Sequence, residues 1–318
     1  MAKAKNSLGG RDILDLASLS VEEYELVLNT AAEMKRIMQR DIKKVPTLRG
    51  KSIINLFYEP STRTRTSFEL AGKYLGADVV NITTSSSSVV KGECLRDTIL
   101  TVQSMRCDAI VMRHPVEGAA VYAAKVAKPI IINAGDGAHA HPSQGLLDMF
   151  TLRERGLQFK GAKMVILGDI LYSRVARSNI TAWKKLGADV HVVGPKTLLP
   201  YDIASLGVTV HDNVEEAIEG AQVIDVLRIQ LERQKSGLFP SPREYARVFG
   251  LSKKRLALAA KDCIVMHPGP MNRGLEISWD VGYCDQAAIR DEVQNGVAVR
   301  MALIYLTLTG GKPIETLN

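Results

Sequence analysis

The chain reads SIINLFYEPSTRTRTSFELAGKYL from Ser52 to Leu75. Residues 53–58 form an apolar run that predicts a buried strand, and residues 68–75 have the composition of a helix. Residues 61–67, between these runs, combine five hydroxyl side chains with two arginines. A strand-to-helix turn directs unpaired N–H groups and the positive end of the helix dipole at one point, where a phosphate can bind. The alternative, an ordinary helix cap beside a solvated arginine, needs only one hydroxyl.

The length and composition indicate a two-domain globular protein. The chain has 318 residues, of which 46% are hydrophobic and 24% are charged. This length is large for a single core, so two domains are expected. The net charge of +7 suits either nucleic acid or a small anionic substrate. We expect the substrate and no nucleic acid, because no cluster of basic and aromatic residues occurs.

The cysteines and the hydropathy pattern bear on the compartment. Cys94, Cys107, Cys263 and Cys284 are far apart and form no C-x-x-C pair, which disfavours a disulfide framework and a metal centre. The amino terminus lacks the apolar region of a signal peptide, and no apolar run is long enough to span a bilayer. We therefore expect a cytoplasmic protein that contacts no membrane.

Short runs rich in Ile and Val alternate with helical segments along the chain. The predicted strands cover residues 52–57, 78–82, 109–112, 130–133, 164–167, 189–193, 208–210, 223–227 and 264–266. This alternation predicts an α/β fold with two doubly wound parallel-sheet domains linked by helices. Ligands of such sheets bind beyond the carboxyl ends of the strands. Arg113, Arg228 and His267 all stand at predicted strand ends.

A short repeat supports two related halves. KYLGADV at residues 73–79 is echoed by KKLGADV at 184–190, and Arg63 and Arg174 stand equally far before the two glycines. Chance is the alternative, since Leu-Gly-Ala-Asp suits any helix end that turns into a strand. We expect one domain over residues 1–142, with a carboxyl-terminal helix (291–318) returning to it, and a second over 143–290.

Two further segments have functional and ordinary interpretations. Residues 133–144 are glycine-rich and place His141 at the start of a helix, where it either donates to a carbonyl oxygen or caps the helix. Residues 85–93 form a serine-rich loop containing Lys91, which is either a catalytic lid or a solvated loop. Residues 168–174 keep only the first glycine of a dinucleotide motif, and no Walker A motif occurs, so no nucleotide cofactor is expected.

Residues 57–69, FYEPSTRTRTSFE, resemble the carbamoyl-phosphate signature of the aspartate/ornithine carbamoyltransferases. The resemblance continues in order along nearly the whole chain. It includes the serine-rich loop, MRHP at 112–115, HPSQ at 141–144, Arg174, DVLRIQ at 225–230 and HPGP at 267–270. This family forms catalytic homotrimers in which the serine-rich loop reaches into the neighbouring site.

The resemblance implies roles for individual residues. Carbamoyl phosphate would bind to Ser61, Thr62, Arg63, Thr64, Arg65, Arg113, His141, Gln144, Gly269 and Pro270. The catalytic residues among them would be Arg63, Thr64, Arg113 and His141. The second substrate would bind to Lys91, Arg174, Arg228 and Gln230. No metal and no cofactor are implied.

Transfer of the carbamoyl group to L-aspartate, in pyrimidine synthesis, fits this chain better than transfer to ornithine. The ornithine branch typically shows a His-Cys-Leu-Pro motif, whereas this chain has His267-Pro268-Gly269-Pro270. A non-enzymatic anion-binding protein of the same fold is the other alternative. The resemblance leaves open a regulatory subunit or a dihydroorotase as a partner.

Overall fold

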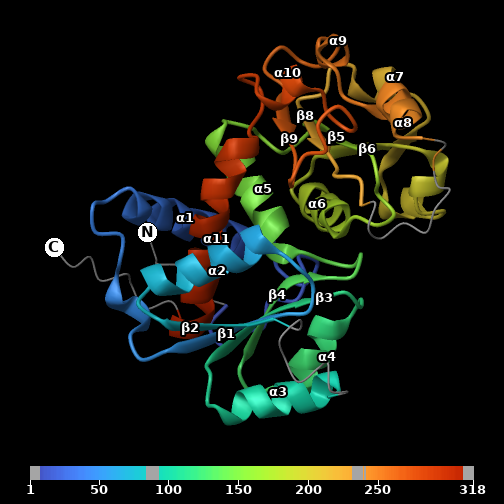
Figure 1. Ribbon diagram of the computed structural model, residues 1–318. Coiled ribbons are helices and arrows are strands. Elements are labelled where there is room, and N and C mark those ends of the chain that lie inside the picture. The colour runs from blue at the N-terminus through green and yellow to red at the C-terminus, as the bar shows by residue number, and fades with distance from the viewer. Residues whose placement is uncertain (1–7, 84–92, 231–238, 240, 311–318) are drawn as a thin grey trace. The chain divides into compact units, whose positions relative to one another are not determined.

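The computed structural model describes residues 8–83, 93–230, 239 and 241–310 (Figure 1). The chain divides into two compact units, each with its own sheet. The first unit comprises Met1–Phe150 and Gln294–Asn318, and the second comprises Thr151–Val293. Two helices, α5 (Pro142–Glu154) and α11 (Ile289–Thr309), have residues in both units.

The sheet of the first unit has the strand order β2-β1-β3-β4, and its strands are parallel. The strands are β1 (Ser52–Phe57), β2 (Asp78–Thr83), β3 (Ala109–His114) and β4 (Ile130–Asp136). The remaining elements are α1 (Val21–Met38), the 3₁₀ helix η1 (Pro46–Leu48), α2 (Thr62–Tyr74), α3 (Leu95–Ser104) and α4 (Ala119–Val126).

Helices pack on both faces of strand β1, whose successive side chains point to opposite sides of the sheet. Ile54 of β1 packs in a buried cluster with Ile99 of α3 and Ala120 of α4. Helix α2 approaches strands β1 and β2 so closely that a Cβ on Gly72 would lie 2.5 Å from Cγ2 of Val79. A glycine here therefore allows α2 to lie directly against the sheet.

The sheet of the second unit has the order β7-β6-β5-β8-β9, again parallel. Its strands are β5 (Lys163–Leu167), β6 (Asp189–Val193), β7 (Thr209–His211), β8 (Val223–Val226) and β9 (Ile264–Met266). Its helices are α6 (Arg174–Lys185), η4 (Lys196–Leu198), η5 (Ile203–Leu206), α7 (Val214–Ile218), α8 (Pro242–Phe249), α9 (Lys253–Leu256) and α10 (Trp279–Gly282).

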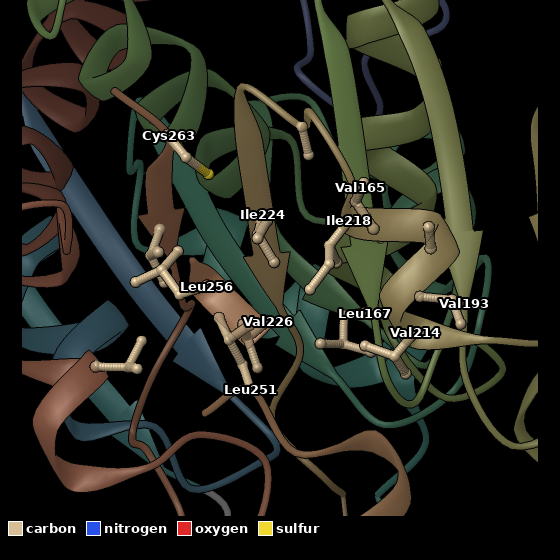
Figure 2. Close-up of a cluster of buried hydrophobic side chains, with 14 of the residues drawn as sticks. Val165, Leu167, Val193, Val214, Ile218, Ile224, Val226, Leu251, Leu256 and Cys263 are labelled. Atoms are coloured by element: carbon tan, nitrogen blue, oxygen red, sulfur yellow. The ribbon is translucent and has the colours of Figure 1, made fainter. Parts of the chain in front are cut away.

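A buried aliphatic cluster fills one side of the second sheet (Figure 2). Figure 2 shows Leu167 of β5 next to Val214 of α7, with Ile218 of the same helix nearby, and Val226 of β8 next to Leu251. Each of these five side chains is at most 2% exposed. The strands of this sheet thus pack against a continuous buried apolar layer.

All nine predicted strands form, and the parallel α/β architecture is confirmed. The predicted strand-to-helix turn at residues 61–67 is wrong in one respect. Helix α2 begins at Thr62, so all of this segment except Ser61 is helical. Thr64, Ser67 and Phe68 are buried, and this packing outweighs the low helix propensity of threonine.

The repeated sequence marks two equivalent strand–helix–strand segments, β1–α2–β2 and β5–α6–β6. Gly76 and Gly187 follow α2 and α6 with φ values of +84° and +82°. In each case the next residue donates back into the helix, Ala77 to Gly72 and Ala188 to Trp183, both at 3.0 Å. This helix-ending arrangement requires a left-handed residue, which glycine adopts without strain.

Candidate active site

The amino terminus of α2 follows the carboxyl end of β1, and the side chain of its N-cap residue does not cap it. Ser61 is the N-cap residue, but its side chain makes no capping hydrogen bond, and the first turn has no acidic residue. Helix α1 differs, since the Ser20 hydroxyl accepts from the Glu23 N–H at 3.2 Å. The first N–H groups of a helix have no partner within the helix. The start of α2 therefore offers donors and a positive dipole to an anion.

Residues 61–65 form this helix end. Thr62 and Arg63 are exposed, Ser61 and Arg65 are half-buried, and Thr64 is buried at 9% exposure. Two guanidiniums beside a helix amino terminus provide the charge and the forked geometry that bind phosphate oxygens. The structure thus brings these five predicted residues together.

Arg113 lies near the end of β3, paired in register with Phe57 of β1. Its Nε donates to Oε2 of Glu59 at 3.2 Å, and its Nη1 donates to the Ala134 carbonyl oxygen at 3.3 Å. The Arg113 side chain is only 14% exposed. The ion pair and the carbonyl contact hold the guanidinium at the same edge of the sheet as the start of α2.

Asp136 organises the glycine-rich segment that leads to His141. Its carboxylate accepts from the Gly118 N–H at 2.8 Å, from Asn133 Nδ2 at 2.8 Å and from the Ala140 N–H at 3.2 Å. His139 Nδ1 lies 3.0 Å from the same carboxylate. Asp136 was not predicted, because nothing in the local sequence shows that an aspartate at a strand end is buried.

His141 and Gln144 lie on either side of the start of α5. His141 is 4% exposed, and its Nδ1 lies 3.5 Å from the Ser143 hydroxyl. The Gln144 backbone N–H donates to the His141 carbonyl at 2.9 Å, which fixes the two residues relative to each other. The Gln144 side chain is 8% exposed and donates from Nε2 to Oδ1 of Asp148 at 2.9 Å. The predicted residues His141 and Gln144 both belong to the first unit.

The second unit holds the predicted arginines beyond β5 and β8, which are neighbouring strands. Arg174 is the first residue of α6 and is 3% exposed. Arg228 donates from Nη1 to Oε1 of Gln230 at 3.2 Å. The Gln230 N–H contacts the buried carboxylate of Asp169, which follows β5, at 3.4 Å. The loops after the two strands are thereby joined.

His267 holds the loop after β9 through both ring nitrogens. Its Nδ1 accepts from the Gly269 N–H at 2.8 Å, and its Nε2 lies 3.0 Å from Oε1 of Glu276. Because Nδ1 is the acceptor, the proton is on Nε2 and points to the carboxylate. Gly269 has a φ of +58°, and its bond to Pro270 is cis. Glu276 has no local sequence signal and was not predicted.

The predicted residues are divided between the units. Gly269 and Pro270 belong to the second unit, whereas the other predicted carbamoyl-phosphate residues belong to the first. Lys91 and residues 84–92 around it lie outside the described residues. Over the described ranges, no group of three or more His, Cys, Asp and Glu residues has an arrangement that could hold a metal ion. None of the helices described is long and apolar enough to cross a membrane.

Two models of one protein family together match most of the chain. The model for the aspartate/ornithine carbamoyltransferase carbamoyl-P binding domain matches residues 11–154. The model for the Asp/Orn binding domain of the same family matches residues 160–307.

Individual relatives agree with this assignment. The aspartate carbamoyltransferase catalytic subunit of Desulforamulus reducens is 60% identical over 95% of this chain and 96% of its own. Aspartate transcarbamoylase from Trypanosoma cruzi, solved with carbamoyl phosphate and aspartate, has a TM-score of 0.85 at 31% identity, covering 97% and 100% of the two chains. Ornithine carbamoyltransferase from Pyrococcus furiosus has a TM-score of 0.84 at 31% identity, covering 96% and 99%. The chain belongs to the aspartate/ornithine carbamoyltransferase family.

Proposed function

We propose that this chain transfers the carbamoyl group of carbamoyl phosphate to L-aspartate, releasing N-carbamoyl-L-aspartate and phosphate. The observation that carries the proposal is the start of α2, where the N-cap side chain makes no capping hydrogen bond and the first turn carries Arg63 and Arg65 but no acidic residue. The relative at 60% identity is named as an aspartate carbamoyltransferase catalytic subunit, which supports the choice of reaction.

In the proposed reaction, Ser61, Thr62, Arg63, Thr64 and Arg65 bind the phosphate group. Donors already in place stabilise the charge that builds up on the departing phosphate. Arg113 is suited to a second task because Glu59 and the Ala134 carbonyl fix its guanidinium. With Thr64 and His141, it donates to the carbonyl oxygen of the carbamoyl group and polarises the carbon for attack.

The carbamoyl nitrogen is held by Gln144 and by the backbone around Gly269 and Pro270. The two carboxylates of aspartate bind to Arg174, Arg228 and Lys91, with Gln230 beside Arg228. Arginine suits this role because its planar fork pairs with a carboxylate through two hydrogen bonds.

The chemical step needs no covalent intermediate with the protein. The aspartate amine attacks the carbamoyl carbon, and a tetrahedral intermediate forms whose oxyanion faces Thr64, Arg113 and His141. The bond from carbon to the bridging oxygen then breaks, phosphate leaves, and the amine proton passes to the phosphate. The side chains contribute position and charge, and no side chain has to accept this proton.

The same proposal extends to assembly and location. Lys91 acts in the site of a neighbouring subunit within a homotrimer, and the enzyme works in the cytoplasm as part of pyrimidine synthesis. The chain also remains compatible with a regulatory subunit or a dihydroorotase as a partner.

A direct assay tests the function. Purified protein is supplied with carbamoyl phosphate and either L-aspartate or L-ornithine, and the carbamoylated product and phosphate are quantified. We expect carbamoyl aspartate and phosphate in equal amounts, and no citrulline above background. Citrulline as the main product would assign the ornithine reaction instead. Binding of carbamoyl phosphate without either product would indicate a binding protein.

A further inference from the structure

The direction of one buried hydrogen bond determines which way the Gln144 amide faces. Nε2 of Gln144 donates to Oδ1 of Asp148 at 2.9 Å, one helical turn further along α5. An ionised carboxylate only accepts hydrogen bonds, so it must face the NH₂ end of the amide. The carbonyl oxygen of Gln144 therefore points away from Asp148, in an orientation that suits a hydrogen-bond donor on a ligand.

Asp148 is suited to hold this arrangement because it is buried and next to a buried cation. Its exposure is 2%, and that of Arg300, on α11, is 5%. Both residues belong to the first unit. Burial lowers the pKa of the Arg300 guanidinium to about 10, the charge of Asp148 opposes this shift, and the charge of Arg63 adds to it. The opposite charges of Asp148 and Arg300 thus attract each other.

The position of Arg300 is itself fixed by packing. Its guanidinium carbon lies 5.1 Å from the centroid of the Phe68 ring, and Phe68 belongs to α2. A Cβ on Gly296 would lie only 2.5 Å from Nη1 of Arg300. Glycine at position 296 thus leaves the space that the guanidinium occupies, and the aromatic face covers its other side.

The orientation of Gln144 matters because carbamoyl phosphate differs from an acyl phosphate in one group. The carbamoyl carbon bears NH₂, which donates hydrogen bonds, whereas the acetyl carbon of acetyl phosphate bears CH₃, which does not. A glutamine whose side-chain oxygen faces the ligand accepts a hydrogen bond from the NH₂ group but forms none with the CH₃ group. A glutamine that presented its NH₂ end would discriminate against the carbamoyl group.

We propose that Asp148 is a positioning residue that holds the Gln144 amide with its oxygen toward the ligand, and that this selects carbamoyl phosphate over acyl phosphates. The inference rests on the proposed function, since it assumes that Gln144 contacts the carbamoyl nitrogen. Asp148 acts through Gln144 and touches no reacting atom.

Affinity measurements with three ligands distinguish this positioning role from a purely structural role of Asp148. Dissociation constants for carbamoyl phosphate, acetyl phosphate and inorganic phosphate are measured by calorimetry on the full-length wild type, Asp148→Asn, Gln144→Leu and the double variant. An asparagine at 148 has a donor as well as an acceptor, so it no longer enforces one amide orientation. We expect Asp148→Asn to reduce the preference for carbamoyl over acetyl phosphate by roughly 5- to 10-fold. Binding of inorganic phosphate should change by less than about twofold.

The double variant provides the matched comparison. In the Gln144→Leu background the oriented oxygen is absent, so Asp148→Asn should leave the ratio of the two affinities unchanged. An equal loss of affinity for all three ligands, or the same change of the affinity ratio in both backgrounds, would overturn the positioning role.

If Asp148→Asn does not fold, Asp148→Asn/Arg300→Met removes both buried charges together and is subject to the same criteria. The proposed function fails separately, if the wild type forms no carbamoyl aspartate.

Discussion

The imidazole Nε2 of His267 and the carboxylate Oε1 of Glu276 lie 3.0 Å apart, and neither side chain is more than 1% exposed. The same carboxylate oxygen accepts from the Asn272 N–H at 2.6 Å. One buried acid therefore fixes the loop that carries Gly269 and Pro270 at both of its ends.

The first prediction concerns this acid. Glu276→Ala leaves the His267 ring and the Asn272 N–H buried without their acceptor, which should cost about 3 kcal/mol of unfolding free energy. We also expect a higher KM for carbamoyl phosphate, because the backbone around Gly269 loses its support. Urea denaturation and steady-state kinetics measure the two effects. Glu219→Ala, an exposed acid of the same unit, is the control and should stay within about 0.5 kcal/mol of the wild type.

Arg63→Ala should abolish most activity without destabilising the protein. Arg63 is exposed in the first turn of α2, so its removal leaves the core intact. Loss of one oriented donor to a developing charge costs roughly 2.7–4 kcal/mol, or about 100- to 1,000-fold in kcat. Arg49→Ala removes another exposed arginine of the same unit and should leave kcat unchanged. Near-normal turnover by Arg63→Ala would remove this residue from the site.

The strands could be predicted from the sequence, but the buried residues that hold the candidate site residues in place could not. A strand buried on both faces is a short run of Ile, Val and Leu, as in Ile53–Ile54 or Val223–Ile224, and such runs stand out locally. The start of α2 was misjudged because Thr and Ser favour turns in isolation, whereas burial of Phe68 and Thr64 decides the outcome.

Supporting residues such as Glu276, Asp136 and Arg300 lack a signal for a different reason. An isolated acid or arginine in sequence is most often solvated, and only the fold shows that these three are buried. Residues that contact a ligand were easier to identify, because several of them share short motifs such as residues 61–65. Arg300 is far in sequence from Asp148, so no spacing rule connects the two.

Arg228→Ala should weaken the use of aspartate and leave carbamoyl phosphate binding nearly unchanged. Arg228 lies beyond β8 in the second unit and contacts Gln230, whereas the start of α2 belongs to the first unit. Loss of a charge-assisted contact costs on the order of 1.5–3 kcal/mol, which corresponds to a rise in KM for aspartate of roughly 10- to 100-fold. Calorimetry with carbamoyl phosphate is the control. If the affinity for carbamoyl phosphate were lost while the KM for aspartate stayed normal, the assignment of residues to the two substrates would have to be reversed.

Asp225 predicts a specific pH dependence of stability. Burial raises its pKa to about 6, although Asn179 Nδ2 donates to it at 3.0 Å. Between the unfolded pKa of about 3.9 and the folded value, the folded protein holds the proton and the unfolded chain does not. The contribution of Asp225 to the unfolding free energy is therefore fully present below pH 4 and is lost as the pH rises through 6. The total loss of unfolding free energy is on the order of 3 kcal/mol.

Asp225→Asn tests this dependence because its side chain is neutral at every pH and can still accept from Asn179. The difference in unfolding free energy between the variant and the wild type should favour the variant at pH 7.5 and diminish toward pH 4. Urea denaturation at a series of pH values measures it. A difference that is constant across the series would show that Asp225 does not titrate as proposed.

Subunit mixing tests the proposed role of Lys91 in a neighbouring site. Lys91→Gln and Arg63→Ala homotrimers should each be nearly inactive, one for lack of the lysine and the other for lack of the phosphate donor. In a mixed trimer, a Lys91→Gln subunit keeps its own Arg63 and receives an intact Lys91 from an Arg63→Ala neighbour. Such an interface contains one complete site, so activity should return when the two proteins are dissociated, mixed and reassembled.

The size of the rescue follows from how subunits assort. In random mixing of equal amounts, three quarters of trimers contain both kinds of subunit, and each of these has one interface with the productive arrangement. Activity should therefore approach about one quarter of the wild type, if the wild type has three sites per trimer. Native mass spectrometry confirms that mixed trimers have formed. A site built wholly within one chain predicts no rescue, because every subunit still carries one lesion, so inactive mixed trimers would return Lys91 to the role of a solvated loop residue.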